Sequence, residues 1–333
     1  MNAIFLSKYP EKLKSVYTLE LRDVICSGCG CDADLYTKED ILACPEKFRH
    51  VKWIFSTWGM PVFTEDEIRD LLPELEAVFY GAGSVQEFAR PFLRCGVKVF
   101  SAWMANAVPV AEYTVAQILL ANKGFFASSR LMSAGSVADA RATGKQYPGN
   151  FDAIVGIIGT GAIGRLVCKA LKQYRIRVLA CSLELDEALA EELGVQISDM
   201  ETIFRTCHVV SNHLANNEKT KGMYKREDFA SMRPYATFLN TGRGAQVVEP
   251  DLIEVLEGRP DLTAVLDVTY PEPPASDSPF YRLPNCILTP HIAGSSGQEV
   301  RRMGEWIWEE FLRYRNKEAC PYEVTEKMLE VMA

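Results

Sequence analysis

Residues 153–164 read Ala-Ile-Val-Gly-Ile-Ile-Gly-Thr-Gly-Ala-Ile-Gly, so a β-branched apolar run breaks into Gly-x-Gly-x-x-Gly, and a helix-like segment follows over residues 165–174. In this strand–turn–helix context the glycine pattern indicates a dinucleotide site. Gly159 permits a tight turn, Gly161 lets the backbone approach a pyrophosphate, and Gly164 lets the helix pack close to the strand. The N-terminus of that helix presents positive partial charge to the phosphates. The alternative is a glycine-rich turn with a purely structural role.

The composition is that of a globular protein. The chain has 333 residues, of which 48% are hydrophobic and 24% charged, and this length suffices for two domains with separate cores. A formal net charge of −8 argues against nucleic acid or an acidic membrane surface as a partner. The sequence contains no apolar run of the roughly 20 residues that a membrane helix needs, and its start, residues 1–8, is too short for a signal-peptide core. We therefore expect a cytoplasmic protein.

Three of the ten cysteines form a close group, Cys26, Cys29 and Cys31, with Cys44 and His50 further along the chain. Thiolates at this spacing could hold zinc or an iron–sulfur cluster. The sequence has no second Cys-x-x-Cys of the kind found in zinc ribbons, which favours the alternative of a glycine-containing loop with free thiols. We expect no metal, and a reducing compartment in which most cysteines are small buried hydrophobic residues.

Strand-like and helix-like segments alternate after the glycine pattern. Five more strand-like runs follow, over residues 177–181, 209–213, 236–240, 264–268 and 286–289. Helix-like stretches, such as residues 186–193 and 249–256, separate them. Repeated β-α-β units imply a parallel, doubly wound sheet with buried strands. We assign residues 107–290 to this dinucleotide-binding Rossmann domain.

A second, smaller α/β domain is expected before it. Short strands are predicted over residues 53–56, 77–80 and 97–100. The predicted fold class is therefore α/β, with two Rossmann-like or flavodoxin-like domains, doubly wound parallel sheets and a cleft between them. Residues 1–106 and 291–333 would form the second domain, which would be the substrate (catalytic) domain.

Two helices are expected to link these domains. A long helix is predicted to begin at Pro109, with Asn106 near its cap, and to cross from the first domain into the second. An apolar stripe near the end of the chain predicts a further helix that folds back on the N-terminal domain. The stripe consists of Met303, Ile307, Phe311 and Tyr314.

Three loops of the nucleotide-binding domain carry residues suited to one reaction. Arg243, Glu272 and His291 follow successive strands at their carboxyl ends, and ligands bind outside that edge of an open parallel sheet. An arginine grips a carboxylate bidentately and a histidine donates a proton to a carbonyl oxygen, as the reduction of a 2-oxo acid requires. A neighbouring glutamate would orient the imidazole and favour its protonated form. Each residue alone could be an ordinary loop residue, but their joint placement favours a catalytic site.

The same loops carry motifs that resemble those of a known family. Residues 240–244, 267–273 and 289–294, together with the glycine pattern, are similar to segments shared by the D-isomer-specific 2-hydroxyacid dehydrogenases. Val110-Ala111-Glu112 and residues 80–85 are also similar to segments of this family. The resemblance covers essentially residues 50–300. It implies hydride transfer between NAD(P) and a D-2-hydroxy acid or its 2-oxo acid.

The resemblance also implies the roles of individual residues. His291 would be the acid/base, Glu272 its partner and Arg243 the anchor of the substrate. Gly81, Ala82 and Gly83 would bind substrate from the smaller domain. The residues implied to contact the cofactor are Gly159, Gly161, Ala162, Ile163, Gly164, Ser182, His213, Leu214, Thr241, Gly242, Asp267 and Gly294. Among these, the amides of Ala162 and Ile163 would bind the pyrophosphate, Asp267 the nicotinamide carboxamide, and His213 the adenosine half. His208 and His50 have no implied role.

The chain departs from the family's pattern near the cofactor. NAD-dependent members have an acidic residue at the position of Ser182, whereas an NADP site would need a basic residue just after it. The chain instead runs Leu183-Glu184-Leu185-Asp186-Glu187, so we expect NAD, with NADP as the alternative. The usual proline after His213 is also missing from residues 214–217, which leaves the shape of that loop open.

The sequence and the resemblance thus predict an NAD(P)-dependent oxidoreductase that acts on a small 2-hydroxy or 2-oxo acid, and the resemblance implies a homodimer. Hydroxypyruvate or glyoxylate, phosphoglycerate and lactate types all remain open. The rival hypothesis is an NAD(H)-sensing binding protein of the corepressor type, which shares the fold. The absence of a basic patch or tail in the sequence gives that hypothesis less support.

Overall fold

The computed structural model describes residues 1–330 and contains two compact units. Unit 1 comprises Met1–Asn106 and the described residues from Ser295 onward, and unit 2 comprises Ala107–Gly294. The chain leaves unit 1 within helix α7 (Trp103–Asn122) and returns to it after Gly294. Each unit has its own sheet and its own hydrophobic core.

Unit 2 is built on a seven-stranded parallel sheet with the order β12-β11-β10-β9-β6-β7-β8. The strands are β6 (Ile154–Ile158), β7 (Arg177–Cys181), β8 (Gln196–Ile197), β9 (Val209–Asn212), β10 (Thr237–Asn240), β11 (Thr263–Leu266) and β12 (Cys286–Leu288). Because β6 lies between β7 and β9, the strand order reverses at the end of β6. Open α/β sheets bind ligands at such a switch point. The predicted doubly wound parallel sheet is confirmed.

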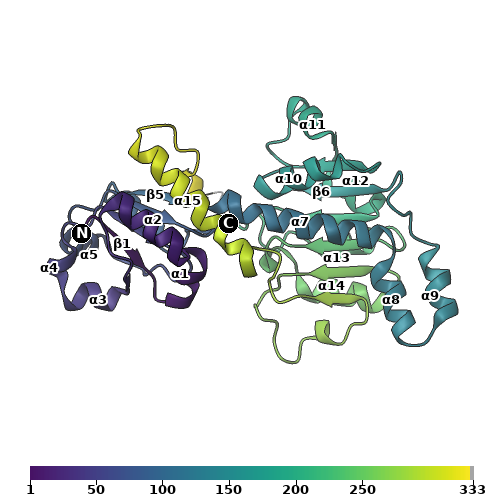
Figure 1. Cartoon of the computed structure of the whole chain (residues 1–333). Coiled ribbons are helices and arrows are strands. Elements are labelled where there is room, and N and C mark those ends of the chain that lie inside the picture. The colour runs from purple at the N-terminus through teal and green to yellow at the C-terminus, as the bar shows by residue number, and fades with distance from the viewer. Residues whose placement is uncertain (331–333) are drawn as a thin grey trace. The chain divides into compact units, whose positions relative to one another are not determined.

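Helices cover both faces of this sheet (Figure 1). The connecting helices are α10 (Ala162–Leu171), α11 (Glu187–Leu193), α12 (Met200–Thr206), α13 (Arg226–Ser231) and α14 (Glu249–Gly258). Val155 of β6 and Val167 of α10 share one core, whereas Phe238 of β10 stacks on Phe204 of α12 and meets Phe229 of α13 edge-on in the other. Strands buried on both faces, such as β6 and β10, read as apolar runs without polar alternation and were predicted from the sequence, whereas β8, with two exposed residues, was not.

Helix α7 begins earlier than predicted. It starts at Trp103, and Pro109 lies inside it and not at its first turn. Asn106 therefore does not cap the helix; its Oδ1 accepts a hydrogen bond from the amide of Ser295 at 3.0 Å. Proline lacks an N–H and disfavours a helix interior, but buried side chains such as Ala105 pack this first stretch into the fold. Packing outweighs the local signal here.

Unit 1 contains a six-stranded sheet with the order β13-β5-β4-β3-β1-β2. Its strands are β1 (Ala3–Leu6), β2 (Leu35–Tyr36), β3 (Trp53–Ser56), β4 (Ala77–Tyr80), β5 (Lys98–Ser101) and β13 (Glu323–Val324). The strand pairs are parallel except for β13, which runs antiparallel to β5. Its helices before α7 are α1 (Pro10–Val16), α2 (Leu19–Cys29), α3 (Lys38–Ala43), α4 (Pro45–Phe48), α5 (Glu65–Leu71) and α6 (Ala89–Arg94). The predicted strands β3, β4 and β5 are present, whereas β2 and β13 are too short to leave a sequence pattern.

The C-terminal helix α15 (Val300–Arg315) belongs to the core of unit 1. Met303, Ile307 and Phe311 are buried there. The Phe311 ring lies edge-on to Phe55 and Phe79, with centroids 5.3 and 5.1 Å away. The prediction that this stripe folds back on the N-terminal part of the chain is confirmed.

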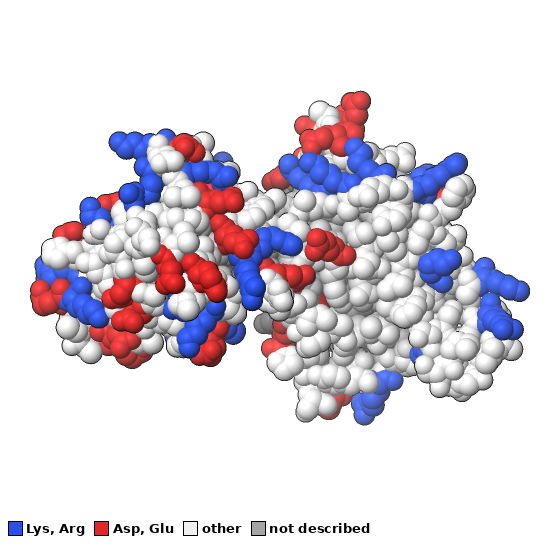
Figure 2. All heavy atoms as spheres, viewed as in Figure 1, with Lys and Arg blue, Asp and Glu red and all other residues white. Residues whose placement is uncertain are grey.

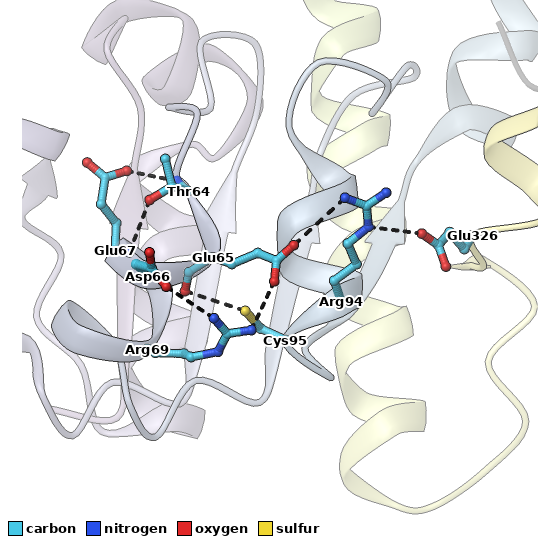
Figure 3. A network of polar contacts seen from close by, with 8 residues as sticks. All are labelled: Thr64, Glu65, Asp66, Glu67, Arg69, Arg94, Cys95 and Glu326. Carbon is cyan, nitrogen blue, oxygen red and sulfur yellow. Dashed lines mark hydrogen bonds and ion pairs between the residues drawn. The ribbon is translucent and has the colours of Figure 1, made fainter.

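A polar network fastens the segment after α15 to the same unit (Figure 3). Arg94 of α6 lies between two carboxylates: its Nε is 3.3 Å from Oε1 of Glu326, and its Nη1 is 3.8 Å from Oε1 of Glu65. Cys95 Sγ lies 3.6 Å from the backbone oxygen of Glu65. Exposed ion pairs of this kind each add little stability, and the segment is held mainly by the pairing of β13 with β5 and by the burial of Val324 and Leu329.

Candidate active site

The glycine pattern forms a tight turn between β6 and α10. Gly159 has a φ of +97°, and a side chain at this position would lie 2.8 Å from the backbone of His213. A side chain at Gly164 would collide with the carbonyl oxygen of Gly159. Gly161 faces open space, so a ligand can reach its backbone. Gly159 therefore permits the turn, Gly164 the close packing of the helix, and Gly161 the approach of a ligand.

Helix α10 presents backbone amides at the end of this turn. It begins at Ala162. The sequence predicted a start at Arg165, because Gly164 in the first turn weakens the sequence signal for a helix. No side chain caps α10 in the described structure, and its N-cap is Gly161. The first amides of a helix have no partner within it, so those of Ala162 and Ile163 are available to a phosphate, which the helix dipole also attracts.

Two buried polar atoms near this turn have no hydrogen-bond partner among residues 1–330, namely Thr160 Oγ1 and His213 Nδ1. Buried polar atoms are normally paired. The other ring nitrogen of His213, Nε2, lies 2.8 Å from Ser211 Oγ. Burial lowers the pKa of His213 to about 3, so its imidazole is neutral at physiological pH. The open turn, the uncapped helix and the unpaired atoms fit a dinucleotide at the end of β6.

A charged pair lies beside the same turn. Arg165 Nε donates to the backbone oxygen of Thr160 at 2.8 Å, and its Nη2 lies 4.0 Å from Oε2 of Glu184. Glu184 follows Ser182, which comes directly after β7. The segment where the family carries its acidic residue thus contributes a carboxylate two positions later, next to a guanidinium.

His291 occupies an unusual backbone conformation on the loop after β12. Its φ is +55°, a region that non-glycine residues rarely adopt and that occurs often at functional sites. Its amide donates to the backbone oxygens of Asp267 and Thr289, each at 3.0 Å. Its Nδ1 lies 2.6 Å from Oε1 of Glu272, and both side chains are about half exposed. The predicted histidine–glutamate pair is thus assembled within unit 2.

Asp267 organises the backbone around His291. The side chain is buried and accepts three hydrogen bonds: Oδ1 from Thr289 Oγ1 at 2.6 Å and from the amide of Ile292 at 2.8 Å, and Oδ2 from the amide of Ala293 at 2.9 Å. A carboxylate has about four acceptor sites. Most of its capacity therefore positions the histidine loop, and one acceptor site is left over; the family resemblance implies a nicotinamide carboxamide as its partner. Gly294 directly follows this segment and ends unit 2.

Arg243 follows β10 with much of its guanidinium buried. Its Nη1 donates to the backbone oxygen of Gly242 at 2.8 Å, and it forms no ion pair with any carboxylate in the described part of the chain. Burial lowers the pKa of Arg243, an effect that the nearby charge of Glu272 opposes, yet a guanidinium stays charged in proteins. Gly244 is required beside it, because a side chain there would overlap the backbone of Thr269. A half-buried cation without an ion-pair partner is suited to bind an anion.

Four buried polar residues behind this edge were not predicted. They are Asn212, Tyr224, Asn240 and Gln246, and they hydrogen-bond to one another and to the backbones of the loops around Arg243 and Leu214. The sequence signal was available, since Asn212 and Asn240 each end an apolar strand, where a buried amide needs a partner. Thr241, also on the arginine loop, is buried with its Oγ1 3.2 Å from that of Thr114.

The predicted substrate residues Gly81, Ala82 and Gly83 belong to unit 1, directly after β4. The Thr57 hydroxyl donates to the Gly81 oxygen at 2.8 Å, and the Ser101 hydroxyl lies 2.9 and 2.6 Å from the oxygens of Ala82 and Gly83. This loop is therefore fixed by side chains of unit 1 itself, whereas Arg243, Glu272 and His291 all belong to unit 2.

The two histidines without an implied role and the cysteine group have partners within the fold. His208 Nδ1 accepts from the amide of Ile154, and His50 Nδ1 lies 2.7 Å from Oε1 of Glu74. Cys26 and Cys31 are in contact through their sulfur atoms at 2.7 Å. Over residues 1–330, no cluster of three or more His, Cys, Asp or Glu side chains has a metal-binding arrangement. No helix in this range is long and apolar enough to cross a membrane.

Comparisons with known proteins agree with this geometry. Residues 115–293 match the model of the NAD-binding domain of the D-isomer specific 2-hydroxyacid dehydrogenases. A D-3-phosphoglycerate dehydrogenase of Archaeoglobus fulgidus is 29% identical over 217 residues, which are 65% of this chain and 41% of that protein. A glyoxylate reductase of Korarchaeum cryptofilum is 31% identical over 177 residues, 53% of each protein. The chain thus spans about half or less of the length of these relatives.

A solved structure shows the same fold over the whole chain. The apo form of D-mandelate dehydrogenase from Rhodotorula graminis superposes with a TM-score of 0.79 at 18% identity, covering 100% of this chain and 99% of that one. At this identity the likeness establishes the fold and not the substrate.

Proposed function

The chain belongs to the D-isomer specific 2-hydroxyacid dehydrogenase family, and on this premise we propose that it interconverts a small D-2-hydroxy acid and its 2-oxo acid. Its NAD-binding domain implies that NAD supplies the site of hydride transfer, the nicotinamide ring. The observation that carries the proposal is the joint placement of Arg243, Glu272 and His291 at the carboxyl ends of β10, β11 and β12.

Each of these residues has a task that its surroundings support. Arg243, without an ion-pair partner among the described residues, binds the substrate carboxylate through its guanidinium fork. His291 donates a proton to the carbonyl oxygen during reduction and accepts it during oxidation. Glu272, 2.6 Å from Nδ1, orients the imidazole so that Nε2 faces the reacting oxygen. Asp267 keeps the backbone of His291 in place through its bonds to Ile292 and Ala293.

The test is a search for turnover. Purified protein is mixed with NADH or NADPH and each of a panel of 2-oxo acids, including glyoxylate, hydroxypyruvate, pyruvate, 3-phosphohydroxypyruvate and phenylglyoxylate, and oxidation of the cofactor is followed at 340 nm. We expect oxidation with at least one acid, and its loss in the His291→Asn variant. Tight NADH binding without turnover on any acid would favour the rival hypothesis of an NAD(H)-sensing binding protein.

We further propose that the protein is a homodimer that pairs through unit 2. Helix α8 (Phe125–Ser133) has no buried residue in the described structure, and Phe125 and Met132 are about half exposed. An apolar hollow lies on α7 and α10, lined by residues that include Val115, Leu119 and Leu166. Figure 2 shows few charged side chains on the face of unit 2 over α7 and α8. Light scattering at micromolar concentration should give twice the mass of one chain, and the mass of a single chain would refute the dimer.

A further inference from the structure

Four fully buried polar side chains connect two loops at the carboxyl edge of the unit 2 sheet. They are Asn212 at the end of β9, Asn240 at the end of β10, Tyr224, and Gln246 in a short 3-10 turn. One loop carries Arg243. The other, residues 213–217, follows β9 and begins beside the glycine turn.

Asn240 shapes the loop that carries the arginine. Its Oδ1 accepts from the amide of Gly242 at 3.0 Å, and its Nδ2 donates to the backbone oxygen of Arg243 at 3.1 Å. A side chain at Gly242 would lie 2.9 Å from Nδ2 of Asn212, so the loop lies directly on the network. The position of the Arg243 backbone thus depends on Asn240.

Gln246 and Asn212 shape the other loop. The Nε2 of Gln246 donates to the backbone oxygens of Leu214 at 3.1 Å and Ala215 at 3.0 Å. The Oδ1 of Asn212 accepts from the amide of Leu214 at 3.1 Å and from the Tyr224 hydroxyl at 2.7 Å. This is the loop that lacks the family's usual proline. Hydrogen bonds from Gln246 therefore restrain a backbone that proline does not restrain here.

The hydrogen bonds that shape the two loops meet at the side-chain amide of Asn212. Asn212 Nδ2 donates both of its hydrogens within the network, to Asn240 Oδ1 at 3.0 Å and to Gln246 Oε1 at 2.6 Å. A buried amide has no water with which to replace a lost partner. Movement of the 213–217 loop therefore strains the bonds to Asn240, and movement of the arginine loop strains the bonds to Gln246.

We propose that Gln246 is a positioning residue that couples the two binding events of the enzyme. A dinucleotide bound against the 213–217 loop orders that loop, and through Gln246, Asn212 and Asn240 it orders the loop of Arg243 for an anionic substrate. The inference rests on the proposed function, which assigns the anion to Arg243, and on the family resemblance, which implies that His213 and Leu214 contact the cofactor. Because linkage is reciprocal, the anion tightens the dinucleotide by the same factor.

The test measures this coupling by calorimetry without turnover. NADH is titrated into the protein with and without saturating oxamate, an unreactive analogue of a 2-oxo acid. In the wild type we expect oxamate to tighten NADH binding roughly tenfold, within the usual range of such couplings. In Gln246→Met, which keeps the volume and removes both donors, the factor should fall below about twofold.

A matched control separates coupling from loss of stability. Asn285 is also a buried amide of unit 2 whose Nδ2 donates to two backbone oxygens, those of Leu256 and Arg259. Asn285→Asp removes donors that lie away from both loops. It should destabilise the fold but keep the wild-type effect of oxamate on NADH binding. Equal oxamate factors in the wild type and Gln246→Met, or a wild-type protein that binds NADH without any effect of oxamate, would overturn the inference and leave the proposed function standing. A wild-type protein that binds neither NADH nor oxamate would overturn both.

Hydrogen exchange provides a second readout if Gln246→Met is unstable. The amide of Gly242 donates to Asn240, and NADH should slow its exchange in the wild type both by contact with this loop and through the network. In Tyr224→Phe, which removes only the hydroxyl bonded to Asn212, NADH should slow this amide less than in the wild type. Identical protection in the two proteins would contradict the coupling.

Discussion

The Nδ1 atom of His291 lies 2.6 Å from Oε1 of Glu272, although 19 residues separate them in the chain. Their loops follow β11 and β12, which are neighbours in the sheet. The backbone of His291 is anchored to buried Asp267, whereas the two side chains are about half exposed. An anchored backbone with exposed side-chain ends is suited to proton exchange with a ligand. Because Nδ1 of His291 is bonded to Glu272, Nε2 is the atom available for that exchange.

Replacing His291 by Asn should remove the proton donor without disturbing the loop, because asparagine tolerates the positive φ at this position. We expect turnover to fall on the order of 10²- to 10⁴-fold, with the affinity for NADH nearly unchanged. Steady-state kinetics and calorimetry measure the two effects. His50→Asn is the matched control, since His50 forms an equivalent pair with Glu74 in unit 1. Turnover of the His291 variant within threefold of the wild type would reject its role.

Glu272→Gln tests the partner. The amide keeps the shape of the side chain but no longer stabilises a charged imidazole at 2.6 Å. Proton donation by His291 needs a correctly oriented ring, so turnover in the reductive direction should fall roughly tenfold or more, with the affinity for NADH nearly unchanged. Glu74→Gln, the same change in the unit 1 pair, should leave turnover as it is. Turnover of Glu272→Gln equal to that of the wild type would mean that Glu272 does not act through His291.

The part of the site that sequence could predict is the part whose spacing follows from strand and turn chemistry. The glycine pattern and the loops of Arg243, Glu272 and His291 each follow an apolar run. In a parallel sheet, these positions meet at one edge. The nearness of the histidine and glutamate loops therefore follows from the neighbouring positions of β11 and β12.

The rest depended on contacts between segments far apart in the chain. The neutrality of His213 comes from burial, which no local pattern shows. Gln246 reaches the backbone of Leu214 from 32 residues away. The start of α7 was misplaced because proline gives a strong local signal, whereas the burial of Ala105 depends on the whole of unit 1.

His213 should make the protein sensitive to acid. Burial lowers its pKa from 6.5 to about 3, so below pH 6.5 the unfolded chain takes up a proton that the folded chain does not. Stability is therefore lost as the pH falls from about 6.5 toward 3, and the loss from this group at pH 5 is about 2 kcal/mol. In His213→Gln, the free energy of unfolding in urea should fall by about that much less between pH 7 and pH 5 than in the wild type.

Ser211→Ala is the control for this comparison. It removes the hydrogen bond between Ser211 and His213 but leaves the imidazole in place, so the wild-type pH dependence should remain. If His213→Gln and the wild type lose the same stability between the two pH values, the imidazole takes up its proton in the folded state and is not desolvated as the structure indicates.

Cofactor choice should depend on Glu184. Ser182 cannot repel a 2′-phosphate as the family's usual carboxylate would, but Glu184 lies 4.0 Å from Arg165 and partly offsets the charge of this guanidinium beside the glycine turn. A phosphate carrying nearly two negative charges would meet this carboxylate. We therefore expect a preference for NADH over NADPH of roughly tenfold in kcat/KM, about 1.4 kcal/mol. Glu184→Ala should free Arg165 and reduce or invert that preference, whereas Glu191→Ala makes the same charge change on the exposed side of α11 and should not. A tenfold advantage for NADPH in the wild type, or equal behaviour of the two variants, would show that Glu184 points away from the ribose.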